Sequence, residues 1–311
     1  MLSFLLRRLA RLLVTVWLAA TFAFLLSCLI PSDAITARLA ASGATANQIE
    51  ARRQALGLAD PPLVQYLRLV ANLARGDLGI SLITGRPVLD MLREPLGATL
   101  LLAGAALLVT LTVGISLGMA AALSERRAVR WGASLAAILA LATPVYWSGT
   151  LAIYWIAVRL RWLPSTGNGS DLRFLILPSL VLGVAGAGGI AQITAAALRE
   201  MRLATFVMTA RGKGLGEGII RRRHMFRMAI GLIASAAALQ WGFLIGGAVV
   251  TEMIFVRPGI GQVLLGAVND QDMPVVGGVV VLSAIVYGIA GMAAEGIALL
   301  ADPRLRGSVV E

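Results

Sequence analysis

Six long stretches without a charged residue constrain this chain more than any other feature of its sequence. They contain 21 to 27 residues each: Leu12–Ser32, Ala98–Leu123, Gly132–Val158, Phe174–Leu198, Met228–Thr251 and Met273–Ala294. A helix that crosses a bilayer needs roughly 17–25 apolar residues at about 1.5 Å each. The runs lack the polar/apolar alternation of a membrane β-barrel, and in lipid the backbone must otherwise bond within helices. We therefore predict an all-α polytopic membrane protein with six transmembrane helices.

The composition argues against a water-soluble protein and against a nucleic-acid-binding protein. The chain has 311 residues, 58% hydrophobic and only 14% charged, with a mean hydropathy of +0.84. A soluble domain carries about 25% charged residues. The net charge of +11 alone would suggest nucleic acid, but in a membrane protein it more often marks the cytoplasmic loops. The single cysteine, Cys28, excludes an intrachain disulfide and a cysteine-based metal site.

Two apolar segments have alternative interpretations. The first run follows Arg7, Arg8 and Arg11 and could be a secretion signal, but it is longer than the roughly 7–15 residues of a signal core. We therefore expect a retained first helix. The run Pro258–Asn269 has 12 residues, which is too short to span, so we expect an interfacial or re-entrant segment.

The distribution of Lys and Arg predicts the topology. With the N-terminus inside, the inner segments hold 16 basic and 6 acidic residues, and the outer segments hold 11 and 10. This positive-inside asymmetry places both termini in the cytoplasm. The chain then divides into the N-terminus with helix 1 (1–32), an extracytoplasmic loop (33–97) and a five-helix core (98–311) with a cytoplasmic loop at 199–227. In the outer loop, Ala46–Leu56 and Leu63–Leu73 are predicted to be short surface helices.

The chain shows little catalytic chemistry. Arg211-Gly212-Lys213-Gly214 is the closest match to a phosphate-binding loop, but it lacks the upstream glycine and the hydroxyl after the lysine. His224 has no second histidine or carboxylate at ligand spacing, so we expect no metal site. Glu252 directly follows the fifth run, at the end of the predicted fifth helix, where we expect a solvated helix edge. The alternative is an ionisable group beside a transport pathway.

The composition of the inner segment 199–227 instead indicates that it binds a partner protein. It is basic and rich in glycine, and Thr205–Lys213 is predicted to form a short helix broken at Gly212 and Gly214. Such a helix can dock into a groove of another subunit.

The residues of this segment resemble a known motif. Thr209-Ala210-Arg211-Gly212-Lys213-Gly214-Leu215 resembles the core of the EAA loop of permease subunits in bacterial ABC importers, with Thr205-Phe206 before it and His224 and Arg227 after it. The likeness implies that these residues couple the permease to an ATPase: Thr205, Phe206, Thr209, Ala210, Arg211, Lys213, Gly214, Leu215, His224 and Arg227.

The rest of the chain resembles the dipeptide/oligopeptide/nickel branch of these permeases. Gly76-Asp77-Leu78-Gly79-Ile80-Ser81 is similar to its outer-loop signature, and the C-terminal motifs also match, including Asp302-Pro303-Arg304. The likeness suggests a pore mouth or a contact with a binding protein at Glu252, Phe255, Pro258, Gly259, Gly261 and Asp272.

The resemblance implies a type I ABC-importer permease in the bacterial inner membrane. Its partners would be a second homologous permease, two cytoplasmic ABC ATPases that bind ATP and Mg²⁺, and an extracytoplasmic solute-binding protein. The chain itself would be non-catalytic and hold no cofactor. Di- and oligopeptides are the expected cargo, with nickel or metal chelates as the alternative. A gradient-driven secondary transporter is a distant alternative, because it would need intramembrane carboxylates or repeat-related broken helices.

Overall fold

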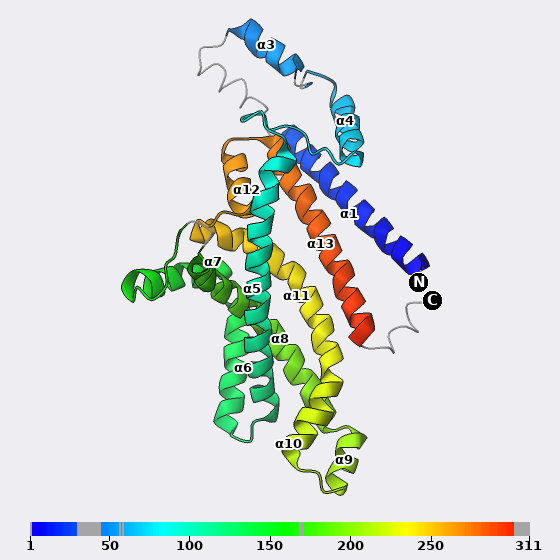
Figure 1. Cartoon of the computed structure of the whole chain (residues 1–311), viewed down its shortest axis with the longest axis vertical. Coiled ribbons are helices and arrows are strands. Elements are labelled where there is room, and N and C mark those ends of the chain that lie inside the picture. The colour runs from blue at the N-terminus through cyan, green and yellow to red at the C-terminus, as the bar shows by residue number, and fades with distance from the viewer. Residues whose placement is uncertain (1, 30–44, 56, 58, 168–170, 302–311) are drawn as a thin grey trace. The chain divides into compact units, whose positions relative to one another are not determined.

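The computed structural model describes every residue except 1, 30–44, 56, 58, 168–170 and 302–311 (Figure 1). The motif around Asp302 therefore lies outside the described residues. The described chain is helical, and its one β pairing is an isolated bridge between Ile80 and Pro87. Its elements are α1 (Leu2–Leu29), α3 (Ala46–Ala55), α4 (Pro62–Ala74), α5 (Val88–Leu123), α6 (Arg127–Ala142), α7 (Val145–Ala152), the π-helix η1 (Ile153–Arg159), α8 (Arg173–Arg202), α9 (Thr205–Gly212), α10 (Glu217–Ile219), the π-helix η2 (Ile220–Met225), α11 (Phe226–Phe255), α12 (Ile260–Asn269) and α13 (Met273–Ala301).

The membrane-spanning helices agree with the charge-free runs. Five helices are long and apolar enough to cross a membrane, and a bent pair makes a sixth candidate. The prediction of an all-helical, multi-pass membrane protein is confirmed. The two short helices predicted between the first two runs are also present, as α3 and α4.

The third run differs from the prediction of one continuous helix. Gly132–Val158 is divided between α6 and the pair α7–η1, which meet at an angle of 103°. The break falls at Thr143-Pro144, where both residues have extended ψ angles of 122° and 136°. Proline disfavours the helical conformation of the residue before it and cannot donate a backbone hydrogen bond. These two residues therefore end α6 and start α7.

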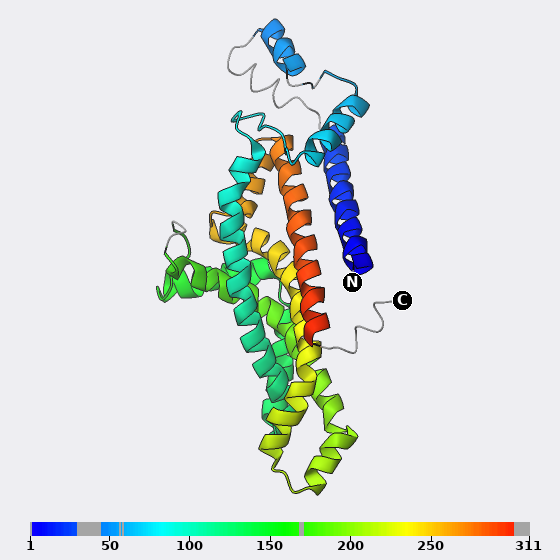
Figure 2. The same ribbon diagram turned by 45° about the vertical axis from the view of Figure 1, so that its right-hand side comes forward.

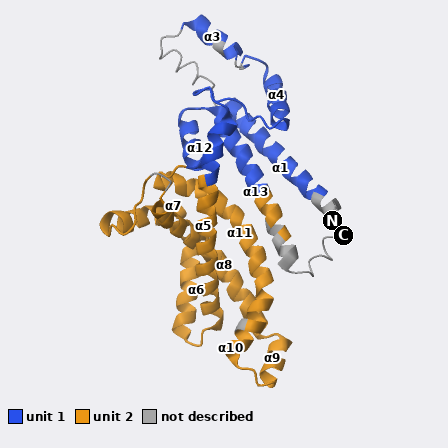
Figure 3. Cartoon of the chain, in the orientation of Figure 1, with its two compact units in different colours: residues 1–97, 259–288 blue, residues 98–258, 289–311 orange. Residues whose placement is uncertain are grey.

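The chain forms two compact units (Figure 3). Unit 1 contains residues 1–97 and 259–288, and unit 2 contains residues 98–258 and 289–311. The long helix α5 begins in the first unit and continues into the second, and so does α13.

Unit 2 is built around α8, which lies beside α6 and α11 (Figure 1). Glycines bring the backbones into close contact. A Cβ atom added at Gly118 would lie 2.7 Å from the Ala191 carbonyl oxygen, and one at Gly188 would lie 2.5 Å from the Ala137 carbonyl oxygen. Small residues at helix interfaces allow such close approach in membranes, where no hydrophobic effect drives helices together.

Two arginines at the end of α8 donate hydrogen bonds to the last carbonyl groups of α5. Arg199 donates from Nη2 to the Ala121 carbonyl at 3.4 Å, and Arg202 donates from Nη1 to the Ala122 carbonyl at 3.2 Å. The last carbonyls of a helix have no partner within it and carry partial negative charge. The two guanidinium groups therefore join the ends of α5 and α8.

Unit 1 packs α1 against α13 through Val16, Ala20 and Val281. Helix α4 contacts α1 through Tyr66, whose hydroxyl is 2.9 Å from the Thr21 hydroxyl. A second cluster joins the first turns of α5 to α12 and α13, through Val88, Leu92, Ile260, Ala267, Val275 and Val279.

We expect two glycines of α5 to respond oppositely to alanine. At Gly97 an added Cβ has open space, and alanine favours a helix over glycine by roughly 1 kcal/mol. At Gly118 the added Cβ would lie 2.5 Å from Thr194 Cβ, so Gly118→Ala should separate α5 from α8. Thermal unfolding of the detergent-purified chain should show a lower midpoint for Gly118→Ala and an equal or higher midpoint for Gly97→Ala. An unchanged unfolding midpoint for Gly118→Ala would contradict the close contact between α5 and α8.

Candidate functional site

Helix α9, which contains five of the ten EAA-like residues, is packed on the rest of unit 2 by one apolar face. Val207 and Ala210 are buried in a cluster with Ile220 and Met225 of η2 and with Leu198 of α8. Residues three apart on a helix share a face, so this spacing directs the two side chains inward. In Figures 1 and 2, α9 lies beside α10 at the end of unit 2.

The opposite face of α9 is exposed and apolar at its centre. Met208 is 66% exposed, between the exposed Thr205 and Thr209. Leu203, just before the helix, is 84% exposed. Neither Met208 nor Leu203 was among the predicted site residues. The helical period could have identified Met208, because it lies on the face opposite Val207 and Ala210.

The turn after α9 explains the glycine of the motif. The Leu215 amide donates to the Ala210 carbonyl at 3.2 Å, and the Gly214 amide donates to the Arg211 carbonyl at 2.9 Å. These two bonds form a Schellman motif, with Gly214 in the left-handed conformation at φ +75°. An added Cβ at Gly214 would meet nothing within 4 Å. The backbone conformation, and not the available space, therefore requires glycine here.

A network of charges ties this turn to its neighbours. Arg211 contacts Glu217 at 2.6 Å (Nε–Oε1), and Arg221 contacts both Glu217 at 3.7 Å and Glu125 at 3.0 Å. The hydrogen bond from Arg211 to Glu217, together with the charge of Glu217, raises the pKa of the Arg211 guanidinium above its ordinary value. Glu125 belongs to the turn between α5 and α6, so the network connects α9, α10 and η2 to that turn.

The other predicted residues of this segment have different environments. Phe206 is half-buried and packs against the same apolar cluster as Val207. His224 is half-buried on η2, while Arg227 at the start of α11 is exposed, as are Lys213 and Leu215. Single-turn π-helical segments such as η2 occur frequently at functional sites.

The predicted pore-mouth residues divide between the two units. In unit 2, Glu252 and Phe255 are buried near the end of α11, and the Phe255 ring lies close to Gly149 of α7. Glu252 is 0% exposed, so the expectation of a solvated helix edge was wrong. Continuation of the chain into the loop and packing on α7 exclude water from this turn. Pro258, also in unit 2, is exposed.

The connection after α11 contains a buried cation. Arg257 is 4% exposed, and its Nη1 donates to the Phe174 carbonyl at 3.4 Å. Burial lowers the pKa of Arg257, and the charge of Glu252 opposes that shift. The residue before it, Val256, has φ +48°, an unusual conformation for a β-branched residue. The end of α11 is therefore defined by a buried acid, a buried base and a strained turn.

In unit 1, Asp272 joins two distant motifs. Its carboxylate accepts hydrogen bonds from the Ser81 hydroxyl at 2.5 Å and from the Leu82 amide at 3.1 Å. The Ser81 hydroxyl oxygen also accepts from the Thr84 amide at 2.9 Å. Gly259 and Gly261, the other predicted residues in this unit, are buried at the start of α12. The outer-loop signature is thus anchored by the C-terminal motif.

No group of three or more His, Cys, Asp or Glu side chains gathers at metal-binding distance in the described part of the chain. The arrangement of α9, its exposed apolar face and its charged turn is suited to binding another protein.

Family models match almost the whole chain. The model described as "Binding-protein-dependent transport system inner membrane component" matches residues 114–307, and the model for the N-terminal part of such membrane components matches residues 1–103.

Two relatives are similar over their full length. A putative peptide transport system permease protein of Brucella abortus (strain 2308) is 32% identical over 98% of this chain and 99% of its own. The glutathione transport system permease protein GsiC of Escherichia coli (strain K12) is also 32% identical, over 98% of this chain and 99% of its own.

The fold also resembles that of a solved transporter. A chain of the MetNI methionine ABC transporter, in an inward-facing conformation, superposes with a TM-score of 0.56 at 18% identity. The match covers 68% of this chain and 96% of that chain. At this identity the likeness concerns the fold alone.

We expect Gly214 to tolerate asparagine better than alanine. An L-residue in the left-handed region costs roughly 1–2 kcal/mol, and asparagine is among the residues that adopt it most readily. Hydrogen exchange at the Gly214 and Leu215 amides should therefore be faster in Gly214→Ala than in Gly214→Asn. Gly216 has φ −65° and open space around it, so Gly216→Ala is the matched control and should leave exchange unchanged. Equal exchange in all three variants would contradict the Schellman turn.

Removal of the Asp272 carboxylate should release the segment around Ser81. Loss of a buried hydrogen-bond partner costs about 1–3 kcal/mol, so Asp272→Ala should increase limited proteolysis between residues 82 and 86. The neighbouring Asp270 is exposed, and Asp270→Ala provides a control with the same change of charge. Equal cleavage of the two variants would show that Asp272 does not anchor the segment.

Proposed function

The chain belongs to the family of binding-protein-dependent transport system inner membrane components, and on that premise we propose that it forms half of the translocation pore of an ATP-driven peptide importer. A second, homologous permease forms the other half. Two cytoplasmic ABC ATPases bind ATP and Mg²⁺ and power transport, and an extracytoplasmic solute-binding protein delivers the substrate. The observation that carries this proposal is α9, which is fixed on its inner face and exposes Met208 outward.

The packing of α9 supports a coupling mechanism. A force on its exposed face passes through Val207 and Ala210 to Ile220 and Met225 of η2, which share one apolar cluster. Helix η2 continues directly into α11. ATP-driven movement of the ATPases would thus bias the spanning helices between inward- and outward-open states.

The segment Arg211–Gly214 supports a non-catalytic role for this chain. Its glycine and lysine form the end of α9, where the Gly214 and Leu215 amides donate to carbonyls of the helix. Amides used in this way are not available to bind a phosphate group. ATP hydrolysis therefore belongs to the partner ATPases.

Peptides are the proposed cargo because relatives 32% identical over nearly full length are named for peptide and glutathione transport. Glutathione is itself a tripeptide. The excess of Lys and Arg in the inner segments supports an assignment of both termini to the cytoplasm and of segment 82–86 to the outer face. The contacts of Asp272 with Ser81 and Leu82 hold one end of this segment, so it would present a defined surface to a binding protein.

Purification of the tagged chain from its native host in a mild detergent tests the proposal. A second permease, P-loop ATPases and a solute-binding protein should co-purify and be identified by mass spectrometry. Uptake of a labelled dipeptide by cells that carry the gene, compared with uptake of nickel, then tests the cargo. A chain that purifies alone and transports along an ion gradient would overturn the importer.

Met208 provides the sharpest test of the ATPase contact. Hot-spot residues near the centre of an interface cost roughly 2 kcal/mol or more when they are truncated. If Met208 is such a residue, Met208→Glu should reduce ATPase co-purification about tenfold or more. Met208→Leu keeps an apolar side chain and should retain the ATPase. Ala128→Glu places the same charge on an exposed position outside α9 and should also retain it. Loss in the Ala128→Glu control would point to a general charge effect.

A further inference from the structure

We propose that unit 2 holds an anionic phospholipid between η1 and the first half of α8, with the headgroup beside Arg161 and Arg173 and one acyl chain along α8. Two neighbouring hollows carry this inference, one charged and aromatic and the other almost entirely apolar. No role of these residues in transport is needed for it.

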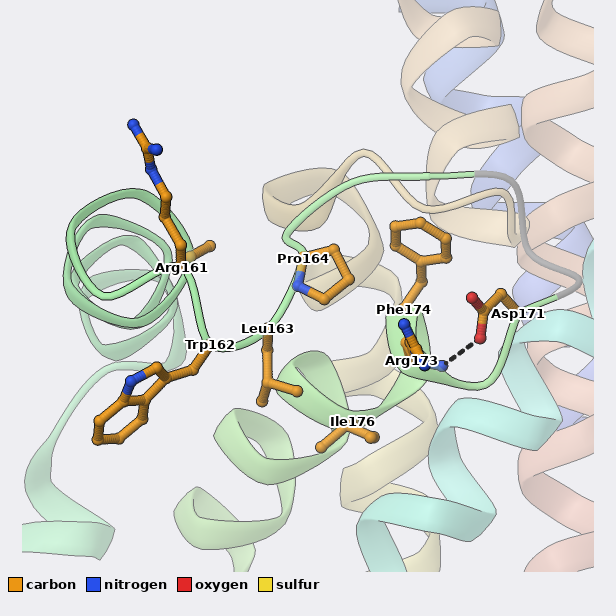
Figure 4. Close-up of a pocket in the computed structure, with 9 residues that line it drawn as sticks. Arg161, Trp162, Leu163, Pro164, Asp171, Arg173, Phe174 and Ile176 are labelled. Carbon is orange, nitrogen blue, oxygen red and sulfur yellow. Dashed lines mark hydrogen bonds between the residues drawn. The ribbon is translucent and has the colours of Figure 1, made fainter.

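The first hollow, of about 630 Å³, is lined by Ala157 of η1, by residues 161–164 and 171 between η1 and α8, and by the start of α8 (Figure 4). Its charged residues are Arg161, Arg173 and Asp171, and the Asp171 carboxylate already accepts the Arg173 amide at 2.9 Å. The balance of charge is positive. The hollow therefore favours an anionic group.

Aromatic and cationic side chains separate at the rim of this hollow. Figure 4 shows Arg161 and Trp162 leaving the backbone in opposite directions. Trp162 is 73% exposed, and Trp155 on η1 is also exposed. Exposed tryptophan beside arginine is typical of the membrane–water interface, where the ring lies at headgroup level and the cation meets phosphate.

The second hollow, of about 420 Å³, lies next to the first and is lined by α6, α7, η1 and α8, and by Thr143 between α6 and α7. Ile156 and Leu177 line it, while their chain neighbours Ala157 and Ile176 line the first. It follows α8 from Leu177 to Ala185, about 12 Å at 1.5 Å per residue. One leaflet of the hydrocarbon core is about 15 Å thick, so this hollow matches the depth of an acyl chain.

The chemistry of the second hollow favours an alkyl chain over a polar ligand. Its lining contains two hydroxyl groups, those of Thr143 and Ser148. Both already donate to backbone carbonyls, Thr143 to Leu139 at 2.6 Å and Ser148 to Val145 at 3.1 Å. The bend at Thr143-Pro144 creates this hollow, because it turns α7 and η1 away from the line of α6. A lipid would thus fill the space that the bend opens.

The test measures lipid binding to the full-length chain, purified in mild detergent with the proteins that accompany it. Native mass spectrometry and thermal unfolding should show selective binding of phosphatidylglycerol over phosphatidylcholine with the same acyl chains. Inorganic phosphate alone should not raise the unfolding midpoint. Stabilisation by phosphate alone, or equal binding of the two lipids, would overturn the proposal.

Matched variants distinguish binding of the headgroup at this hollow from a general effect of positive charge. Each arginine near an anionic lipid surface changes affinity by roughly fivefold, so the double variant R161Q/R173Q should bind phosphatidylglycerol about 25-fold more weakly. R126Q/R127Q removes the same charge from the exposed N-terminal end of α6 and should change the affinity less than twofold. Equal loss in the two double variants would overturn the assignment to this hollow.

The apolar part has its own controls. Val184→Trp fills the second hollow and should displace the lipid, whereas Leu135→Trp enlarges an exposed residue of α6 outside it. Benzoylphenylalanine in place of Leu180 should form a photo-adduct with the mass of phosphatidylglycerol. An adduct with another polypeptide would instead show that a protein covers this face, and would overturn the proposal.

Discussion

The structure of unit 2 depends on the close approach of helix backbones to α8. In lipid each spanning helix satisfies its own backbone, and no hydrophobic effect holds one helix to the next. Contact area between the helices must supply the attraction. Glycines at Gly114, Gly118, Gly183 and Gly188 leave no room for a Cβ atom, so α5 and α6 pack directly on α8. This close packing brings the arginines of α8 to the last carbonyl groups of α5. It also places Leu198 of α8 in the apolar cluster on which α9 packs.

Much of the fold could be predicted from the sequence, because uninterrupted apolar length is nearly sufficient to identify a membrane helix. The 103° bend could not be predicted in this way. Pro95 and Pro178 lie inside continuous helices, whereas Pro144 lies at the break between α6 and α7. The same residue type thus has two outcomes, and the packing around each proline decides between them. A sequence pattern records the proline but not that packing.

The position of helix α9 was predicted from the sequence, but its orientation was not. The motif identified α9, yet the sequence alone did not tell which of its faces meets η2. Ala210 belongs to the motif and supports the helix from inside, while Met208 lies outside the motif's marked residues and faces out. The Ser81–Asp272 bond joins residues 191 positions apart, a pairing that spacing cannot reveal. Glu252 was misjudged because burial at a helix end depends on the loop that covers it.

The charged network around Glu217 makes the turn after α9 sensitive to ionic strength. Arg211 and Glu217 are each more than two-fifths exposed, so dissolved ions screen their attraction over a Debye length of roughly 8 Å at physiological salt. The apolar contacts of Val207 and Ala210 are not screened in this way. A higher salt concentration would therefore weaken the ion pair in the turn after α9, while the helix itself would stay packed on its apolar cluster. Apolar packing that does not depend on salt therefore holds α9, whereas an ion pair that weakens with salt holds the turn after it.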